Sequence, residues 1–440
     1  MNAPAGPPPP PPPPPPARDA RRRRRWPLPA GLAVAALLTG VVAAPAYAEP
    51  RADPVRERQM PALRAIRADD AWKITKGRGV TVAVLDTGVV PTVKDLAGAV
   101  RTGPDFTGTG NDPGGPAWGE HGTLMATLIA GRGHGPGFTA GAIGVAPQAT
   151  ILSLRVTVDD TDPGRERFRA DPTRATGVAQ AIRYAVDHGA TVINLSLGGF
   201  GSARADRQAL DYALARGVVV VGAAGNEGRS GFTRTYGFSR ESFPGGYAGV
   251  IGVGAVDERF KPATFSSRNA TVSVSAPGVR LVGAGAKDDY YWVNGTSGAA
   301  ALVTGVAALI KARHPLLPPA LVARALTDTT RERPKDGYDV GVGFGVVDAE
   351  AALRRSDELA AYRPTAAPGE TGRREGGGVA AEATTAVPTA PVANGEDAGG
   401  SAVPRWALLL IGAMCVVTAA VAARGLALVA VARRSARRRP

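Results

Sequence analysis

The stretch VAVLDTGV, Val82–Val89, takes four apolar residues straight into a carboxylate, Asp86, and then turns on a glycine. Asp and Gly often follow a strand because both suit tight turns. In a parallel sheet, however, the same carboxylate would lie at the carboxyl edge, where ligands and catalytic groups collect. The rest of the chain indicates whether Asp86 is only a turn residue or a catalytic or ligand-binding group.

The middle of the chain alternates strand patterns with helical patterns. The strand patterns are nearly continuous in apolar residues and lie at 79–86, 150–156, 191–197 and 217–225. Such strands belong to parallel sheets that are covered on both faces. The helical patterns at 176–188 and 204–216 each end at a glycine, Gly189 and Gly217. The alternation predicts an α/β domain of three layers, with a central, mostly parallel sheet flanked by helices.

The N-terminal 48 residues have the pattern of a secretory signal. A proline run is followed by RRRRR, a short apolar stretch at 31–44 and the small residues AYA at 46–48. A basic region, an apolar core and a small-residue site predict export with cleavage after Ala48. An uncleaved membrane anchor is the alternative interpretation. Residues 49–78 then form an N-terminal extension that is short for a domain that folds by itself, so we expect it to pack on the domain that follows.

The C-terminal end predicts a tether and an anchor. Residues 356–403 are rich in Ala, Gly, Glu, Thr and Pro, a composition too poor in large apolar residues to build a core. The run 406–423 has no charged residue and is near the lower limit for a spanning helix. We therefore predict an α/β domain at 79–355, a linker at 356–403, a transmembrane helix at 404–432 and a basic cytoplasmic tail at 433–440.

Charge and cysteine content exclude several classes of protein. The net charge of +14 comes largely from arginines that flank the two apolar terminal runs, where membrane topology signals lie. No basic, aromatic-rich pattern typical of nucleic-acid binding appears, so we expect no nucleic-acid partner. The single cysteine, Cys415, excludes an intramolecular disulfide and a zinc site built on cysteines.

Asp86, His121 and Ser297 together indicate a function that none of them indicates alone. His121 begins an amphipathic helical run in EHGTLMATLIAG, and Ser297 begins a long apolar helix in NGTSGAAALVTG. Singly, the first is more often structural and the second more often a helix N-cap. Asp86, His121 and Ser297, however, occur in the order of the subtilisin triad, each in a glycine-flanked turn. A serine nucleophile needs a base, and that base needs a carboxylate to orient it.

The blocks VAVLDTGV, HGT, VINLSLGG, AAGNEG and NGTSGAA, in this order, resemble the subtilisin-like serine peptidases. By this resemblance Asp86, His121 and Ser297 match the catalytic triad. Asn226 matches the side chain that helps to form the oxyanion hole, which agrees with the need for a fixed donor where negative charge develops. The chemistry requires no metal ion and no organic cofactor.

The same resemblance implies which residues contact the peptide substrate. They lie in two segments whose small side chains leave backbone groups accessible to an added strand. These residues are Ser196, Leu197, Gly198, Ala223, Ala224 and Gly225. Two positions depart from the family pattern: Gly298 follows the serine, where a larger residue such as Met is more common, and Glu120 precedes the histidine, where glycine is usual.

The entry segment, the signal, the linker and the anchor together look like a mycosin, a membrane-anchored subtilase associated with type VII secretion. This predicts an extracytoplasmic serine endopeptidase held at the cell membrane, with protein or peptide substrates and a secretion membrane complex as partners. Two alternatives stay open. The domain could mainly brace such a complex, with proteolysis secondary, or it could be a general secreted degradative protease.

The patterns around the other histidines and one acidic loop allow only less specific predictions. His134 lies in a glycine-rich loop and is either a surface residue or a substrate contact. His188 and His314 lie at helix ends and are expected to be structural. The loop that carries Asp159, Asp160 and Asp162 is either solvated or a calcium site, since calcium needs several oxygen ligands.

Overall fold

The computed structural model describes residues 53–110, 113, 115, 118–171 and 174–362. The predicted signal, transmembrane helix and basic tail, and Cys415, lie outside these residues, as does nearly all of the predicted linker. Among the described residues no helix has both the length and the apolar character needed to cross a bilayer. The described residues belong to one compact unit.

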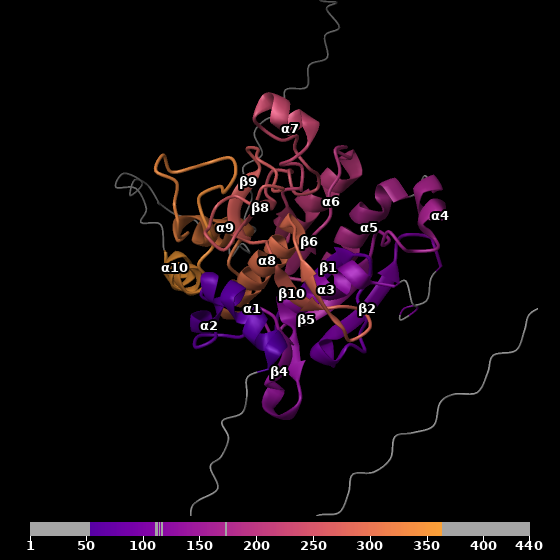
Figure 1. Cartoon of the computed structure of the whole chain (residues 1–440), viewed down its shortest axis with the longest axis horizontal. Coiled ribbons are helices and arrows are strands. Elements are labelled where there is room, and N and C mark those ends of the chain that lie inside the picture. The colour runs from indigo at the N-terminus through magenta and orange to yellow at the C-terminus, as the bar shows by residue number, and fades with distance from the viewer. Residues whose placement is uncertain (1–52, 111–112, 114, 116–117, 172–173, 363–440) are drawn as a thin grey trace, which may run out of the picture. The chain divides into compact units, whose positions relative to one another are not determined.

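A single parallel sheet of seven strands forms the centre of this unit, in the order β2-β5-β1-β6-β7-β8-β9 (Figure 1). Every neighbouring pair in it is parallel. The strands are β1 Thr81–Asp86, β2 Val100–Asp105, β5 Thr150–Arg155, β6 Val192–Leu195, β7 Val219–Ala223, β8 Ile251–Val256 and β9 Val272–Pro277. Two antiparallel hairpins complete the strands: β3 Arg132–His134 with β4 Ala140–Ile143, and β10 Leu281–Ala284 with β11 Tyr290–Val293.

Helices cover both faces of the sheet, as the alternation predicted. They are α1 Pro54–Ala65, α2 Ala68–Ala71, α3 Glu120–Ala130, α4 Arg165–Ala170, α5 Arg174–Asp187, α6 Arg204–Ala215, α7 Gly231–Tyr236, α8 Thr296–Arg313, α9 Pro319–Asp328 and α10 Ala349–Ala361, with 3-10 turns η1 Lys94–Leu96 and η2 Pro136–Phe138. Gly189 and Gly217, expected to end two helices, have φ values of 81° and 77°, in the left-handed region.

Side chains of β1 show why both faces must be covered. Val82 and Val84 point into a core shared with α3, α8 and the N- and C-terminal helices, whereas Ala83 and Leu85 point into a second core shared with α5 and α6. All four are fully buried. Because alternate residues of a strand face opposite sides, a strand apolar at every position requires helices above and below it. Figure 1 shows α5 and α6 on one side and α2, α9 and α10 on the other.

The N-terminal extension packs on the domain, as expected. Leu63 of α1 is buried, and α1 lies against β4 and β10. The side chain of Gln59, also buried, accepts a hydrogen bond from the Ile143 amide at 2.8 Å and donates to the Val282 carbonyl at 3.3 Å. One side chain thus joins α1 to both hairpins.

Residues 356–361, which the sequence predicts to be the start of a linker, belong to helix α10 in the structure. Helix α10 continues to Ala361, and Ser356 is fully buried on it. Arg355 binds Asp328 of α9 at 2.9 Å, which attaches this end of α10 to its neighbour. The pattern of these last helical turns is weak because only one of their faces is apolar.

Candidate active site

Asp86 and His121 form a hydrogen-bonded pair at the carboxyl edge of the sheet. Asp86 is the last residue of β1 and is 1% exposed. Its Oδ1 lies 2.7 Å from His121 Nδ1, so Nδ1–H donates to the carboxylate and Nε2 is left available. Asp86 Oδ1 also accepts a hydrogen bond from the Thr87 amide at 2.7 Å. The carboxylate therefore ends the strand and fixes one tautomer of the imidazole.

Two glycines allow the strand end and the helix start to come together. Gly88 has a φ of 101°, and a Cβ there would lie 2.6 Å from the Trp118 ring. A Cβ on Gly122, the residue after the histidine, would lie 2.1 Å from the Gly88 carbonyl oxygen. The turn after Asp86 and the start of α3 can touch only because both positions lack a side chain.

Ser297, in the first turn of α8, lies against the end of the neighbouring strand β6. Val84 pairs with Asn194 in the parallel register of β1 and β6. Two residues further along each strand, Asp86 therefore lies level with Ser196. Adjacent strands are about 4.8 Å apart. The Ser297 hydroxyl donates to the Ser196 carbonyl at 3.1 Å, and the Ser196 hydroxyl donates to the Ser297 carbonyl at 2.9 Å. The serine is thereby held one strand away from the Asp86–His121 pair.

The electrostatic surroundings favour the protonated form of His121. Burial lowers the pKa of the imidazole, but the charge and hydrogen bond of Asp86, helped by the charge of Asp159, outweigh this and raise the pKa above its ordinary value. About a third of the side chain, 34%, remains exposed. A partly open imidazole with a raised pKa can accept a proton and hold it while a bond rearranges.

Asn226 is oriented by the residue that precedes the serine. Its Oδ1 accepts hydrogen bonds from the Thr296 amide at 3.0 Å and the Thr296 hydroxyl at 3.1 Å. With the oxygen engaged, the Asn226 amide nitrogen is the group left to donate. Thr296 was not singled out in the sequence, although its place beside Ser297 in NGTSG was the available signal.

A cavity of about 220 Å³ opens directly beside Ser297 and Asn226. Its lining includes five of the six residues expected to contact substrate: Ser196, Leu197, Gly198, Ala223 and Gly225. Ala224 does not line it; that residue is fully buried, and its amide donates to the Val253 carbonyl at 3.0 Å. In the described part of the chain the backbones of Leu197 and Gly198 make no recorded hydrogen bond, so their polar groups are free to pair with a peptide.

The two departures from the family pattern have local causes. A Cβ on Gly298 would lie 2.7 Å from the Leu281 side chain of β10, so the space of a larger residue is already filled. The Glu120 carboxylate accepts a hydrogen bond from the Ala286 amide at 3.4 Å, and burial raises the pKa of Glu120. It ties the start of α3 to the loop of the β10–β11 hairpin.

The acidic loop after β5 is neither a simple solvated loop nor an evident metal site. Asp162 is buried and forms an ion pair with the buried Arg155. Asp159 accepts hydrogen bonds from the backbone amides of Glu120 at 3.0 Å and His121 at 3.2 Å. Within the described ranges no cluster of three His, Cys, Asp or Glu residues could hold a metal ion. Asp159 thus supplies the cap that Gly119, which lacks a side chain, cannot give to α3.

The three remaining histidines have partners away from the catalytic edge. His134, which ends β3, lies 2.7 Å from Asp95. His188 stacks on Tyr184 just after α5, with ring centroids 3.6 Å apart. His314 caps α8 and lies 2.7 Å from Asp357. Neither His134 nor His121 is among the residues that line the cavity beside Ser297.

Comparisons with known proteins agree with this geometry. Residues 77–345 match the subtilase family, Peptidase_S8. Mycosin-1 of Mycobacterium tuberculosis is 37% identical over 325 residues, which cover 64% of this chain and 70% of mycosin-1. Fervidolysin of Fervidobacterium pennivorans is 36% identical over 313 residues, 64% of this chain but 42% of fervidolysin, so the chain spans less than half of that relative.

A solved structure extends the likeness to three dimensions. MycP1, described as a serine protease and an essential component of the type VII (ESX-1) secretion system, superimposes with a TM-score of 0.57 and 32% identity, covering 69% of this chain and 91% of MycP1. The chain belongs to the subtilase family and is a serine-type endopeptidase of that family. Among subtilases it is similar to the mycosins.

Proposed function

We propose that Asp86, His121 and Ser297 are the catalytic triad of this endopeptidase. The observation that carries the proposal is the placement of the Asp86–His121 pair and of Ser297 at two adjacent strand ends. Ser297 Oγ attacks the scissile carbonyl carbon while His121 Nε2 takes its proton. Asp86 keeps Nδ1 protonated and stabilises the imidazolium.

The oxyanion of the tetrahedral intermediate would be held by two donors, the Asn226 side-chain amide and the Ser297 backbone amide. Thr296 fixes the orientation of Asn226 before substrate arrives, so no reorganisation is needed when charge develops. Collapse breaks the peptide C–N bond, and His121 gives its proton to the leaving amine. Water then attacks the ester of Ser297, with His121 again acting as base, and releases the second product.

The substrate would bind as an added strand along Leu197 and Gly198, whose backbone groups are unpaired in the described part of the chain. The side chain that precedes the cleaved bond would enter the cavity of about 220 Å³ between the segments at 196–198 and 223–225. The small residues of both walls leave room for it, and the polar carbonyl is thereby aligned with Ser297 and Asn226.

We further propose that the endopeptidase domain is extracytoplasmic, anchored in the cell membrane by residues 404–432, and associated with a type VII secretion complex. The export pattern before Ala48, the uncharged run at 406–423 and the basic tail support this topology. The similarity to mycosin-1 and to MycP1 supports the association with secretion.

The catalytic proposal is tested with a fluorophosphonate probe on the purified full-length protein. We expect an adduct that maps to Ser297 and disappears in His121→Ala, because the serine reacts only when a base activates it. Absence of an adduct on the folded chain, or an adduct that persists in His121→Ala, would contradict an activated triad.

The secretion proposal needs a separate experiment in cells. Secretion is compared between a strain carrying Ser297→Ala and a strain lacking the whole protein. Loss of secretion in both strains would place proteolysis in the pathway. Loss only in the deletion strain would mean that the domain mainly braces the complex, and normal secretion in both would favour a general degradative protease.

A further inference from the structure

A second, larger cavity lies at the opposite edge of the sheet from the triad. It has a volume of about 650 Å³ and shares no lining residue with the cavity beside Ser297. Lys76 and Arg78 line it just before β1, and Gln148 lines it just before β5. Since β1 is six residues long, about 16 Å of strand separates this cavity from Asp86. A molecule bound here would therefore leave the cavity beside Ser297 open.

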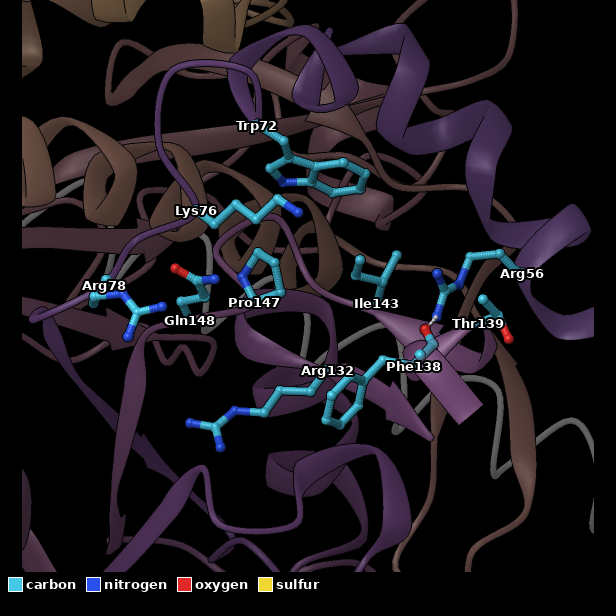
Figure 2. Close-up of a pocket in the computed structure, with 11 residues that line it drawn as sticks. Arg56, Trp72, Lys76, Arg78, Arg132, Phe138, Thr139, Ile143, Pro147 and Gln148 are labelled. Carbon is cyan, nitrogen blue, oxygen red and sulfur yellow. Dashed lines mark hydrogen bonds between the residues drawn. The ribbon is translucent and has the colours of Figure 1, made fainter. Parts of the chain in front are cut away.

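This cationic cavity is lined by four cations and no carboxylate (Figure 2), the four being Arg56, Lys76, Arg78 and Arg132. Within the described residues none of them forms an ion pair. Arg56 donates to three backbone carbonyls, and the charges of Asp95 and Asp53 act on it. The other three form a wall of like charges, which repel one another until an anion enters the concave site.

Apolar side chains supply a second part of the lining, and they are those of Trp72, Phe138, Ile143 and Pro147. The Trp72 ring is fixed by a hydrogen bond from Nε1 to the Val145 carbonyl at 2.8 Å. Figure 2 shows Lys76 and Arg78 on one side of the cavity, and Ile143 and Phe138 toward the other. A ligand that fills the cavity would therefore combine negative charge with an apolar group.

Phe138 differs from the other apolar lining residues because its backbone is strained. Its φ is 58°, in the left-handed region that bulky residues rarely adopt. The hairpin tip holds it there, since the Phe138 amide donates to the Gly135 carbonyl at 3.1 Å and the Phe138 carbonyl accepts from Arg56 at 3.2 Å. The side chain is 62% exposed, so packing within the described chain does not account for an aromatic ring here. Strained residues cluster at sites that clamp a ligand, which indicates that this ring contacts something outside the domain.

A peptide fits this lining better than a compact anion or a bilayer. Compact phosphate sites are typically built from converging backbone amides. Here the amides of Phe138, Ile143 and Gln148 already donate within the protein, so side-chain cations from separate segments supply the charge. Guanidinium groups pair with carboxylates in a fixed geometry, and an apolar side chain would cover the exposed ring. The volume is that of an ordinary ligand site, roughly 300–1,000 Å³, into which a flat membrane surface cannot enter.

We propose that the cationic cavity is a docking site for an acidic peptide segment of a partner protein. Carboxylates of the segment would pair with Lys76, Arg78 and Arg132, and an apolar side chain between them would pack on Phe138. The partner would then hold the domain by the amino edge of the sheet and leave the carboxyl edge, with Ser297, open to substrate. The inference does not depend on the catalytic or secretion proposals.

The test uses a fluorescent peptide of the sequence EEFEE and the purified full-length protein. The protein carries Ser297→Ala so that the probe is not cut, and mass spectrometry checks that the probe stays intact. Fluorescence anisotropy should show saturable binding that weakens about tenfold or more in Lys76→Glu, Arg78→Glu, because two charge-assisted contacts are reversed. Binding should also weaken in molar salt, which screens exposed charges, and with the probe EEAEE, which lacks the apolar side chain.

Phe138→Gly separates a binding role of the ring from a structural one. Glycine adopts a φ of 58° without strain, so the urea midpoint of unfolding should not fall. Binding of EEFEE should nevertheless weaken about fivefold, because the apolar contact is lost. A fall in the midpoint with unchanged binding would mean that the ring serves the fold alone, and it would overturn the docking role of Phe138.

A matched control accounts for the net charge of +14, which attracts any acidic probe. Arg259→Glu with Lys335→Glu makes the same change of charge at two exposed cations that do not line the cavity. It should leave the affinity for EEFEE unchanged. An equal loss of affinity in this variant and in Lys76→Glu, Arg78→Glu would show attraction to the whole surface and would overturn the proposal.

A photoreactive benzoylphenylalanine in place of the probe's phenylalanine locates the site. We expect an adduct, mapped by mass spectrometry, within the two lining segments at 72–78 and 132–148. No saturable binding at millimolar probe, or an adduct elsewhere in the chain, overturns the proposal. Tripolyphosphate or phosphatidylglycerol vesicles that displace the probe more effectively than unlabelled EEFEE would overturn it as well, and would assign the cavity to a small polyanion or to a lipid headgroup.

Discussion

Two of the three histidine–aspartate pairs among the described residues have nearly the same geometry. In both, Nδ1 lies 2.7 Å from Oδ1, the imidazole side chain is 34% exposed and the carboxylate side chain is 1% exposed. One pair is Asp86–His121 at the carboxyl edge of the sheet. The other is Asp95–His134, which joins η1 to the β3–β4 hairpin. By distance and burial alone the two could not be told apart.

Their surroundings differ in what the carboxylate and the imidazole meet next. The second oxygen of Asp95 accepts hydrogen bonds from the Ala142 amide at 2.8 Å and the Tyr290 hydroxyl at 3.0 Å. The second oxygen of Asp86 is buried and has no recorded partner among the described residues. A fully satisfied carboxylate suits a structural clasp, whereas an incompletely satisfied one is typical of functional sites.

The comparison shows that a histidine–aspartate pair is not a catalytic unit by itself. His121 is hydrogen-bonded to Asp86, one strand away from Ser297 and from the cavity that Ser297 and Asn226 line. His134 lies on a hairpin, away from that cavity. The parallel sheet makes the difference, because it brings the ends of β1 and β6 together at one edge.

The largest expected effect separates the two histidines by activity. His121→Ala should lower kcat on the order of 10⁶-fold, the loss that removing a triad member causes in subtilisin. His134→Ala should leave kcat within a few-fold of the unaltered enzyme. Steady-state kinetics on a peptide substrate measures both. A large loss of kcat in folded His134→Ala would erase the distinction.

The second expected effect concerns the oxyanion donor, which has no counterpart beside His134. Asn226→Ala should lower kcat about 10²–10³-fold with little change in KM, because the donor acts mainly on the transition state. Asn294→Ala, in the turn before Ser297, is the matched control and should retain kcat. A KM effect of equal size for Asn226→Ala would instead indicate a role in ground-state binding.

The third effect is on stability. His134→Ala removes one of three partners of buried Asp95 and should lower the free energy of unfolding by about 1–3 kcal/mol. Urea denaturation followed by circular dichroism measures it, and Tyr290→Phe, which removes another partner, should lower stability in the same direction. Unchanged unfolding midpoints for both variants would mean that the pair does not clasp the hairpin.

The smallest expected effect is a shift in the pH dependence of kcat/KM, which depends on the pKa of His121. Its pKa is raised, and the enzyme needs the neutral imidazole, so activity is lost as pH falls through that pKa. Asp159→Asn removes one charge that raises this pKa, so the acid limb of kcat/KM should move to lower pH. Asp160→Asn, at a 90% exposed carboxylate in the same loop, should not move it. A shift to higher pH in Asp159→Asn would contradict the assignment.

Much of the architecture was predictable because it follows from local pattern. Continuous apolar strands such as 79–86 and 217–225 indicated a parallel sheet with two covered faces, and the glycines at 189 and 217 marked helix ends. The errors fell where a single apolar face was short, as at the end of α10, and in the acidic loop, where Asp159 accepts hydrogen bonds from amides 38 and 39 residues away. Local composition cannot distinguish a solvated loop from one that is buried by distant residues.

The sequence by itself determined the α/β class and named Asp86, His121, Ser297 and Asn226, because glycine turns at strand and helix ends leave a readable motif. Only the tertiary structure decided what surrounds them. Asp159 is 38 residues from His121, and Thr296 is 70 from Asn226. The clasp at His134 and the cationic cavity likewise join separate segments. Contacts between distant segments have no periodicity along the chain, so they become visible only once the sheet has brought the segments together.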